Sequence, residues 1–124
     1  MTPYAQYLII WVIVVLNYEE DIKGMCDFLA KTLTQKNIDY DNSFEQTIKD
    51  YGLITIPITL EHKMRRISNI IKKNRKQLIN ESLEDSLLDL AGYAILSVII
   101  LDKRRLEKWV KKQISDSLKR AWAF

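Results

Sequence analysis

Three acidic residues recur at every fourth position, Glu81, Asp85 and Asp89, and we call them the carboxylate row. On an α-helix they share one face, each rotated by about 40° from the last. Neighbours in the row have Cβ atoms roughly 6 Å apart, close enough to share a hard cation. The outer two lie about 12 Å apart along the axis, so one ion cannot bind all three. The row therefore suits either a pair of Mg²⁺ ions completed by phosphates and water, or a solvated acidic face paired with lysines.

The segment Lys36–Phe44, KNIDYDNSF, contains a second set of candidate residues. Its Asn, Asp and Ser residues favour a turn, because their side chains bond to nearby backbone groups. In a functional interpretation Asp39 faces a metal, while Lys36, Asn42 and Ser43 contact a nucleotide. In a structural interpretation the segment is a turn between helices, anchored by its two aromatic residues.

Lys63 and Arg66 are three residues apart and can point the same way from one helix. Arginine grips phosphate with a bidentate fork and lysine supplies a point charge, so the pair suits a phosphate chain. The alternative is a solvated basic face. His62 has no Ser or Cys arrangement beside it that would support nucleophilic catalysis, and neither glycine-rich phosphate-binding motif occurs.

The carboxylate row requires a helix, and apolar spacing predicts one over Glu81–Leu101. A second face of this helix is apolar, and we expect it to be buried. We call this face the apolar stripe; its members are Leu83, Leu87, Leu90, Ala91, Ala94 and Val98.

The remaining pattern predicts an all-α protein, a small helical bundle. Ten apolar residues, Tyr7–Leu16, form a strand, a short buried helix or an oligomer contact, and their β-branched content favours the strand. The run is too short to span a membrane, and no basic segment or cleavage site flanks it as in a signal peptide, so a membrane-associated end is the minor alternative. The other predicted elements are a helix from Asn17 to about Lys36, a short helix from Ser43 or Phe44 to Asp50 ended by Gly52, a helix from Thr55 or Ile56 to about Lys73, a loop at Asn74–Asn80 and an amphipathic helix from about Asp102.

Length and composition are those of one globular domain. The chain has 124 residues, 48% hydrophobic and 28% charged, with three Gly and two Pro. One Cys and one His exclude an intramolecular disulfide and give little support to a zinc site, which suits a reducing, cytoplasmic location. We expect one domain over 1–124, with an apolar extension at 1–16, a core at 17–101 and a basic helix at 102–124.

The net charge of +3 is unevenly distributed. Asp102–Arg120 contains eight Lys/Arg and three Asp/Glu, and Lys63–Lys76 contains seven Lys/Arg and no acid. Such segments either receive phosphates or anionic surfaces, or are solvated faces.

Three segments in this order resemble the nucleotide modification associated domain type 1 family of phages and bacteria, which is similar to the MazG-like all-α nucleoside triphosphate pyrophosphatases. The family pattern K-N-x-D-Y-G-N-S-F is similar to Lys36–Phe44. The pattern D-K-x-x-R is similar to His62–Arg66, and E-S-x-x-D-x-L-x-D-L-A-x-Y-A to Glu81–Ala94. Asp41 replaces a glycine of the pattern, which predicts a strained backbone, and His62 replaces an acid, which removes a candidate metal ligand.

The resemblance implies hydrolysis of a nucleotide or deoxynucleotide between its α- and β-phosphates. Mg²⁺ would be held by Glu81, Asp85 and Asp89, with Glu81 and Asp85 in catalytic roles. Lys36, Asp39, Asn42, Ser43, Lys63 and Arg66 would bind the nucleotide. The row needs additional acidic partners, and Asp39 and Glu61 are the candidates. The resemblance also implies a homo-oligomer with sites near helix interfaces.

Two other hypotheses remain. A non-catalytic binding or regulatory protein that keeps the fold is favoured by the substitutions at Asp41 and His62. Association with a membrane or nucleic acid through the basic last helix, with Trp109 and Trp122, ranks third. No base-reading motif supports it, so we expect neither a specific nucleic acid nor a membrane as the main partner.

Overall fold

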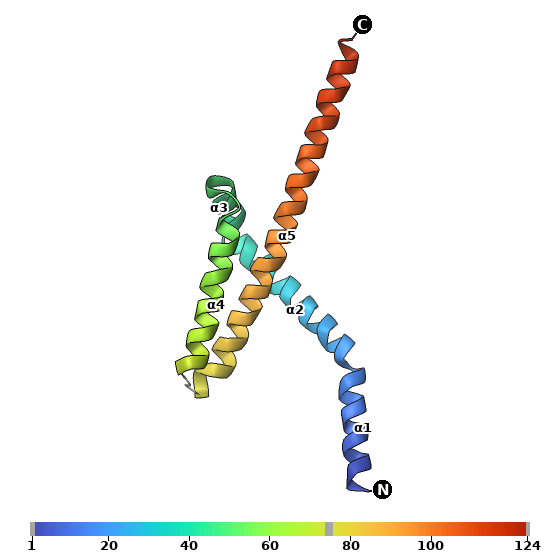
Figure 1. Ribbon diagram of the computed structural model, residues 1–124, viewed down its shortest axis with the longest axis vertical. Coiled ribbons are helices and arrows are strands. Elements are labelled where there is room, and N and C mark those ends of the chain that lie inside the picture. The colour runs from blue at the N-terminus through green and yellow to red at the C-terminus, as the bar shows by residue number, and fades with distance from the viewer. Residues whose placement is uncertain (1, 74–75, 124) are drawn as a thin grey trace. The chain divides into compact units, whose positions relative to one another are not determined.

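The computed structural model describes residues 2–73 and 76–123, without the side chains of Leu16 and of residues 76–82. All regular structure in these residues is α-helical, as predicted (Figure 1). The helices are α1 (Pro3–Leu16), α2 (Tyr18–Asp39), α3 (Ser43–Tyr51), α4 (Thr55–Lys73) and α5 (Lys76–Ala121). They form two compact units, Met1–Asn42 and Ser43–Phe124.

The first unit begins with α1, where the preference for a strand over Tyr7–Leu16 is wrong. A short apolar run does not distinguish a buried strand from a buried helix. A strand also needs neighbouring strands, and the described residues contain none. Pro3 at the first helical turn favours the helix instead, because its missing N–H costs nothing there.

Helix α2 ends three residues later than predicted, in a tight turn at 40–42. The backbone N–H of Tyr40 donates to the Lys36 carbonyl at 3.0 Å, and that of Asn42 donates to the Asn37 carbonyl at 3.1 Å. Asp41 and Asn42 have φ values of +52° and +55°. The strained backbone predicted at Asp41 is thus confirmed, and Asp and Asn are the non-glycine residues that best tolerate this conformation.

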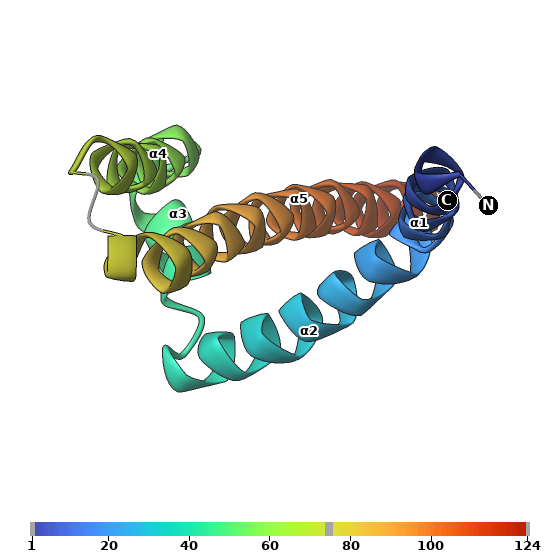
Figure 2. The same cartoon turned by 90° about the horizontal axis from the view of Figure 1, so that it is seen from below.

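The second unit is built on an antiparallel pair of helices, α4 and α5, which lie side by side (Figures 1 and 2). The predicted bounds of α3 and α4 are confirmed to within a residue. Between these helices, Gly52 has φ +86° and its N–H donates to the Ile48 carbonyl at 2.8 Å. Gly52 therefore ends α3 as expected, in a conformation that glycine adopts without strain.

Helix α5 is one continuous helix of 46 residues, where the sequence predicted a loop, a helix and a further helix. Residues 76–80 of the predicted loop are helical, and Asn74 and Arg75 lie outside the described residues. The expected boundary near Asp102 is also absent. Lysine, arginine, glutamate and leucine predominate at 102–108, and these residues favour a helix interior. The change from apolar to charged residues therefore does not end the helix.

The buried face of α5 coincides only in part with the apolar stripe, of which Leu83 and Leu90 are half-buried. Ser86, Ser97 and Ile100 are buried on α5, as is Ile67 on α4, whereas Leu87 and Val98 of the stripe are 49% and 57% exposed. The expectation that these stripe residues are buried is therefore wrong within this unit. Serine at the contact lets two helices approach closely, so small residues define the buried face here more than large apolar ones.

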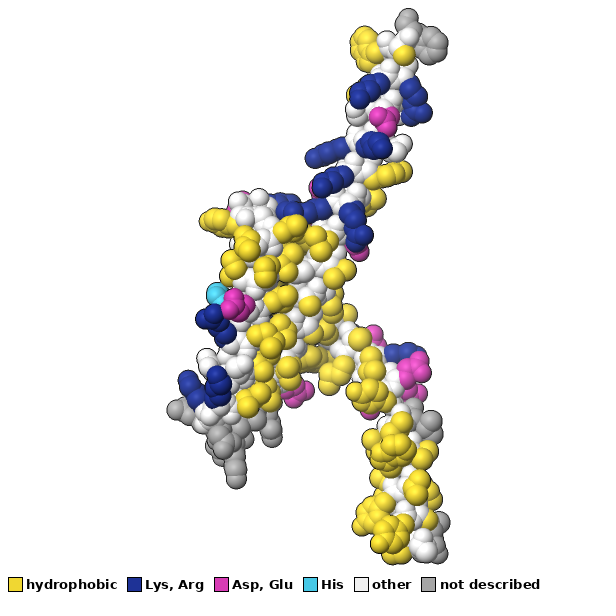
Figure 3. All heavy atoms as spheres, in the orientation of Figure 1, with side chains coloured by type: hydrophobic (Ala, Val, Ile, Leu, Met, Phe, Trp, Pro, Cys, Tyr) yellow, Lys and Arg dark blue, Asp and Glu magenta, His cyan; other side chains and the backbone are white. Residues whose placement is uncertain are grey.

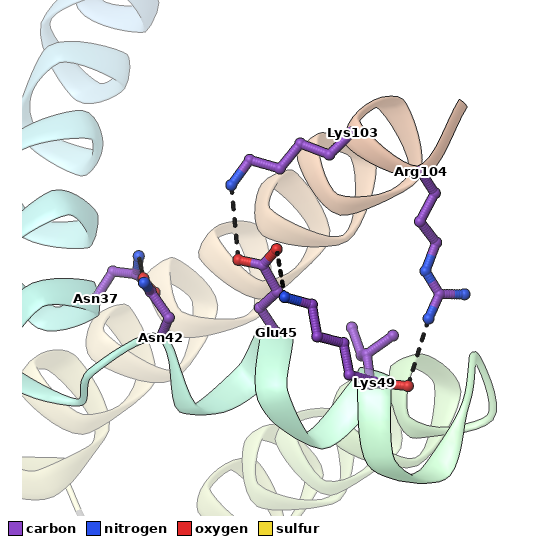
Figure 4. Close-up of polar contacts among 7 residues, drawn as sticks. Asn37, Asn42, Glu45, Lys49, Lys103 and Arg104 are labelled. Carbon is purple, nitrogen blue, oxygen red and sulfur yellow. Dashed lines mark hydrogen bonds and ion pairs between the residues drawn. The ribbon is translucent and has the colours of Figure 1, made fainter. Parts of the chain in front are cut away.

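Charged side chains link helix α3 to α5 through an ion pair and a hydrogen bond (Figure 4). Glu45 accepts ion pairs from Lys49 of its own helix at 3.8 Å and from Lys103 of α5 at 3.6 Å. Arg104 donates to the Ile48 carbonyl at 3.4 Å. Beyond Arg104, residues 105–121 of α5 are exposed apart from the half-buried Asp116. None of the described helices is both long and apolar enough to cross a membrane.

Ile48 has no exposed surface, so its truncation tests this packing. We expect Ile48→Ala to lower the free energy of unfolding by about 2–4 kcal/mol, since a cavity replaces most of a buried isoleucine side chain. Ile58→Ala is the control, because Ile58 is exposed and should cost less than about 1 kcal/mol. Urea unfolding followed by circular dichroism measures both. Equal losses for the two variants would contradict this description of the core.

Candidate functional site

An ion pair joins the two long helices of the second unit. Lys63 Nζ of α4 donates to Asp89 Oδ2 of α5 at 3.1 Å. The two side chains are 23% and 28% exposed, so water screens their charges less than on an open surface. The structure thus brings Lys63 to one member of the carboxylate row, and a shared functional site stays a prediction.

Tyr93 completes this cluster, one helical turn after Asp89. Lys63 Nζ lies 5.2 Å from the centroid of the Tyr93 ring, in cation–π geometry. The Phe44 ring packs edge-on against Tyr93, with centroids 5.0 Å apart and planes at 74°. Phe44 therefore packs against another side chain. The three segments with family resemblance meet here, through Phe44, Lys63 and the pair Asp89–Tyr93.

Sequence reasoning gave Tyr93 no role, although its spacing contained the signal. A residue four positions after Asp89 lies on the same face of a helix. Ser86, three positions before Asp89, is also on this face and is 1% exposed. A bulky residue there would separate α4 from α5, so Ser86 helps to determine how closely Lys63 approaches Asp89.

The other two members of the carboxylate row are placed less completely. Asp85 lies one turn before Asp89 and is exposed. Glu81 belongs to α5, but its side chain lies outside the described residues. Within the described part of the chain, no group of three or more His, Cys, Asp or Glu side chains could hold a metal ion.

Two carboxylates one turn apart still fit Mg²⁺. This ion is commonly bound by one or two carboxylates, with waters and phosphate oxygens filling the remaining positions. Asp85 and Asp89 would supply those carboxylates. Asp89 already contacts the Lys63 ammonium through Oδ2, so a metal would share this carboxylate with Lys63 or displace the ammonium.

Arg66 lies on α4 beside a shallow hollow of about 410 Å³. Positions three apart on a helix differ by about 60°, so Arg66 is close to the Lys63 side of α4. Cationic and polar side chains predominate around the hollow, whose lining is His62, Arg65, Arg66, Asn69, Ile70 and Lys73. The hollow is therefore a positively charged surface on α4, the helix that also carries Lys63.

Glu61 does not join this cluster. It forms an ion pair with Arg65 at 2.6 Å on the exposed side of α4. Positions two apart on a helix differ by about 160°, so Glu61 lies on the opposite side of α4 from Lys63. The expectation that Glu61 supplements the carboxylate row is wrong within this unit.

The candidate residues of the first segment have local roles. Asp39 accepts a hydrogen bond from Gln35 Nε2 at 2.8 Å, and Asn42 accepts one from the Asn37 side chain (Figure 4). Lys36 lies one turn before Tyr40 near the end of α2. These three belong to the first unit.

Ser43 begins α3 in the second unit. Its carbonyl accepts a hydrogen bond from Thr47 Oγ1 at 2.8 Å. The described bonds of Asp39, Asn42 and Ser43 are thus those of a turn followed by a new helix, and a nucleotide contact at these positions stays a prediction.

A double-mutant cycle measures the ion pair. We expect Lys63→Met and Asp89→Asn to show a coupling of about 1 kcal/mol in the free energy of unfolding, because both charges are partly shielded. The exposed pair Glu61–Arg65 is the matched control, with less than about 0.5 kcal/mol expected. Coupling at Lys63–Asp89 no greater than in the control pair would contradict a shielded contact.

Comparison with known proteins gives one family. Residues 36–101, more than half of the chain, match the family described as nucleotide modification associated domain 1. No curated protein and no solved structure matches the chain. The matched range includes every residue of the cluster around Lys63, Asp89 and Tyr93. The chain belongs to the nucleotide modification associated domain 1 family.

Proposed function

We propose that the chain binds a nucleotide through its phosphates and, with Mg²⁺, hydrolyses it between the α- and β-phosphates. The observation that supports this most is the convergence of three separate segments on the Lys63–Asp89 pair and Tyr93. The family description links such chains to nucleotide modification. The resemblance to MazG-like pyrophosphatases suggests the reaction.

The basic side of the cluster suits the phosphate chain. Lys63 supplies a point charge that Tyr93 and Asp89 hold in place, so little side-chain entropy remains to be lost on binding. Arg66 adds a guanidinium at the edge of the neighbouring hollow, where it can make a bidentate contact. A phosphate at Lys63 would then extend toward Arg66.

The acidic side suits the metal. When bound, Mg²⁺ would activate a water molecule and neutralise charge that develops on the phosphates. Asp85 and Asp89 would hold the ion. Glu81, one turn earlier on α5, is the candidate for a second ion. Lys63, adjacent to Asp89, would keep the phosphate oxygens close to the carboxylates and so limit the geometries available to the reacting groups.

Pyrophosphate release from a panel of deoxynucleoside triphosphates tests this proposal. We expect Asp85→Asn and Asp89→Asn each to lower kcat/KM by about 100-fold or more, because each removes a carboxylate that would hold the ion. Glu84→Gln is the matched control, since Glu84 adjoins Asp85 on α5 but points about 100° away. Equal rates for all four proteins would exclude these roles.

A binding protein without catalysis is the second candidate, and the Lys63–Asp89 pair favours it. An ammonium at Asp89 occupies a carboxylate that a metal would need. The distinguishing result is calorimetric: nucleotide binding that weakens about tenfold in Lys63→Met but does not require Mg²⁺, together with no pyrophosphate release. Absence of nucleotide binding with and without Mg²⁺ would exclude both candidates.

We also propose that the chain is a homo-oligomer, in which a second copy covers the apolar stripe. Leu87, Ala91, Ala94 and Val98 follow a four-three-four spacing along an exposed face of α5. This spacing suits helices that pack at about 20°, as in four-helix bundles. Apolar side chains continue across the neighbouring surface of the α4–α5 pair (Figure 3).

Light scattering tests the oligomer. We expect Ala94→Glu to shift the mass toward the monomer, because a charge at the centre of the stripe would be buried without a partner. Arg105→Glu, at an exposed position outside the stripe, is the control. A monomeric wild-type chain at concentrations of about 100 μM would overturn this proposal.

A further inference from the structure

The last four turns of α5, Leu106–Ala121, extend past the final bond between α3 and α5 at Arg104. Such a segment forms readily because it continues a helix already nucleated by packing. Its large apolar side chains are nevertheless in water, and Trp109 and Trp122 are 59% and 83% exposed. We call residues 106–122 the distal segment. An amphipathic helix this exposed is typical of one that packs on a further surface.

The distal segment has a lysine face and an apolar face on opposite sides. Lys108, Lys112 and Lys119 lie within about 40° of one another and about 160–180° from Val110. Leu106, Ile114 and Leu118 are exposed apolar residues within about 80° of Val110. Trp109 lies at the boundary, about 100° from Val110, and Trp122 directly follows the end of α5. Lysine and arginine side chains follow this part of α5 in Figure 3.

The boundary between the two faces is basic as well. Lys111 and Arg120 lie about 80–100° to either side of Val110. Their methylene stems can cover apolar surface while the charged groups reach outward. Lys111 also borders a shallow hollow of about 440 Å³ that Ile114, Leu118 and Trp122 line. From Leu106 to Ala121 there are five Lys/Arg against two Asp/Glu.

We propose that the distal segment binds the surface of an anionic lipid bilayer, lying flat with Val110 and its apolar neighbours toward the acyl chains. Tryptophan at the headgroup level, flanking cations and an opposite lysine face are the features of interfacial helices. The net positive charge complements acidic headgroups. The contact is peripheral, because α5 is not apolar enough to cross a membrane.

Other occupants fit the distal segment less well. A nucleic acid would pair with the lysine face but would leave Trp109, Ile114 and Trp122 in water. A second copy would cover the apolar face but would bring Lys111 and Arg120 of both chains to one interface. Of these three partners, only a surface with anionic headgroups and an apolar interior both attracts the lysines and covers the apolar side chains.

Helix α1 supports a lipid surface independently. Its sequence PYAQYLIIWVIVVL contains no charged residue, and it is apolar on all sides. Most of its large side chains are exposed, including Trp11 at 64%. A helix that is apolar all round needs cover from protein or lipid. A chain with exposed large apolar side chains on both α1 and the distal segment has more than one means of binding a bilayer.

Co-sedimentation of the full chain with vesicles tests the proposal. We expect binding to vesicles of phosphatidylcholine with roughly 30 mol% phosphatidylserine, weakened by salt, and at least tenfold weaker binding to phosphatidylcholine alone. Lys108→Glu with Lys112→Glu should reduce the partition coefficient at least about tenfold. Trp109→Ser with Trp122→Ser should reduce it similarly, because two aromatic anchors are lost. Circular dichroism checks that each variant keeps its helix content.

The matched control is Lys72→Glu with Lys73→Glu, which makes the same charge change at the exposed end of α4. It should leave vesicle binding within about twofold of the wild type. Equal weakening by the control would reduce the effect to net charge and overturn the proposal. Binding that survives both distal variants would assign the contact to another part of the chain.

Two further results would also overturn it. Duplex DNA binding that depends on Lys108 and Lys112, without vesicle binding, would identify a nucleic-acid surface. A concentration-dependent mass that falls in the tryptophan variant, again without vesicle binding, would identify a second copy as the occupant. Neither result changes the pyrophosphate release that we expect, so the lipid-surface proposal and the nucleotide-site proposal can be contradicted independently of each other.

Discussion

The ion pair between Lys63 and Asp89 is the interaction on which the cluster around Tyr93 depends, because each charged group lies beside one of opposite sign. A phosphate bound to Lys63 would compete with Asp89 for the ammonium, and a metal bound to Asp89 would compete with Lys63 for the carboxylate. A nucleotide bound to Mg²⁺ brings an anion for the lysine and a cation for the carboxylate together. Under the function proposed above, the pair would therefore favour the complex over either component, since the complex supplies an opposite charge to each of the two groups.

Much of the chain could be predicted because local signals and tertiary packing agree. Gly52 is an example: its place after an apolar run marked the end of α3, and its φ of +86° is one that glycine adopts freely. The motif residues Lys63 and Asp89 are in contact, while the nucleotide site to which the resemblance assigns them stays a prediction. Residue types and their spacing were enough to predict the structure wherever the conformation of a single turn of chain determined it.

The misses share a physical cause, which is that packing partners cannot be read from one helix alone. The face of Glu81–Leu101 with the most large apolar residues was expected to be buried, yet Ser86 and Ser97 are buried while Leu87 and Val98 are exposed. A helix contact depends on how near two axes approach, and small residues permit this without a hydrophobic signal. Tyr7–Leu16 was misjudged similarly, because its apolar run fits either period.

The unbroken course of α5 fixes the directions of its two uncovered apolar faces. Ala94 lies at the centre of the apolar stripe and Val110 at the centre of the apolar side of the distal segment. Sixteen residues at 100° each leave these two directions about 160° apart around one axis. A single flat surface or one straight partner helix cannot cover both. A chain that satisfied both would join two different neighbours on opposite sides of one rod, and inserting one residue between them would turn the second face by about 100°.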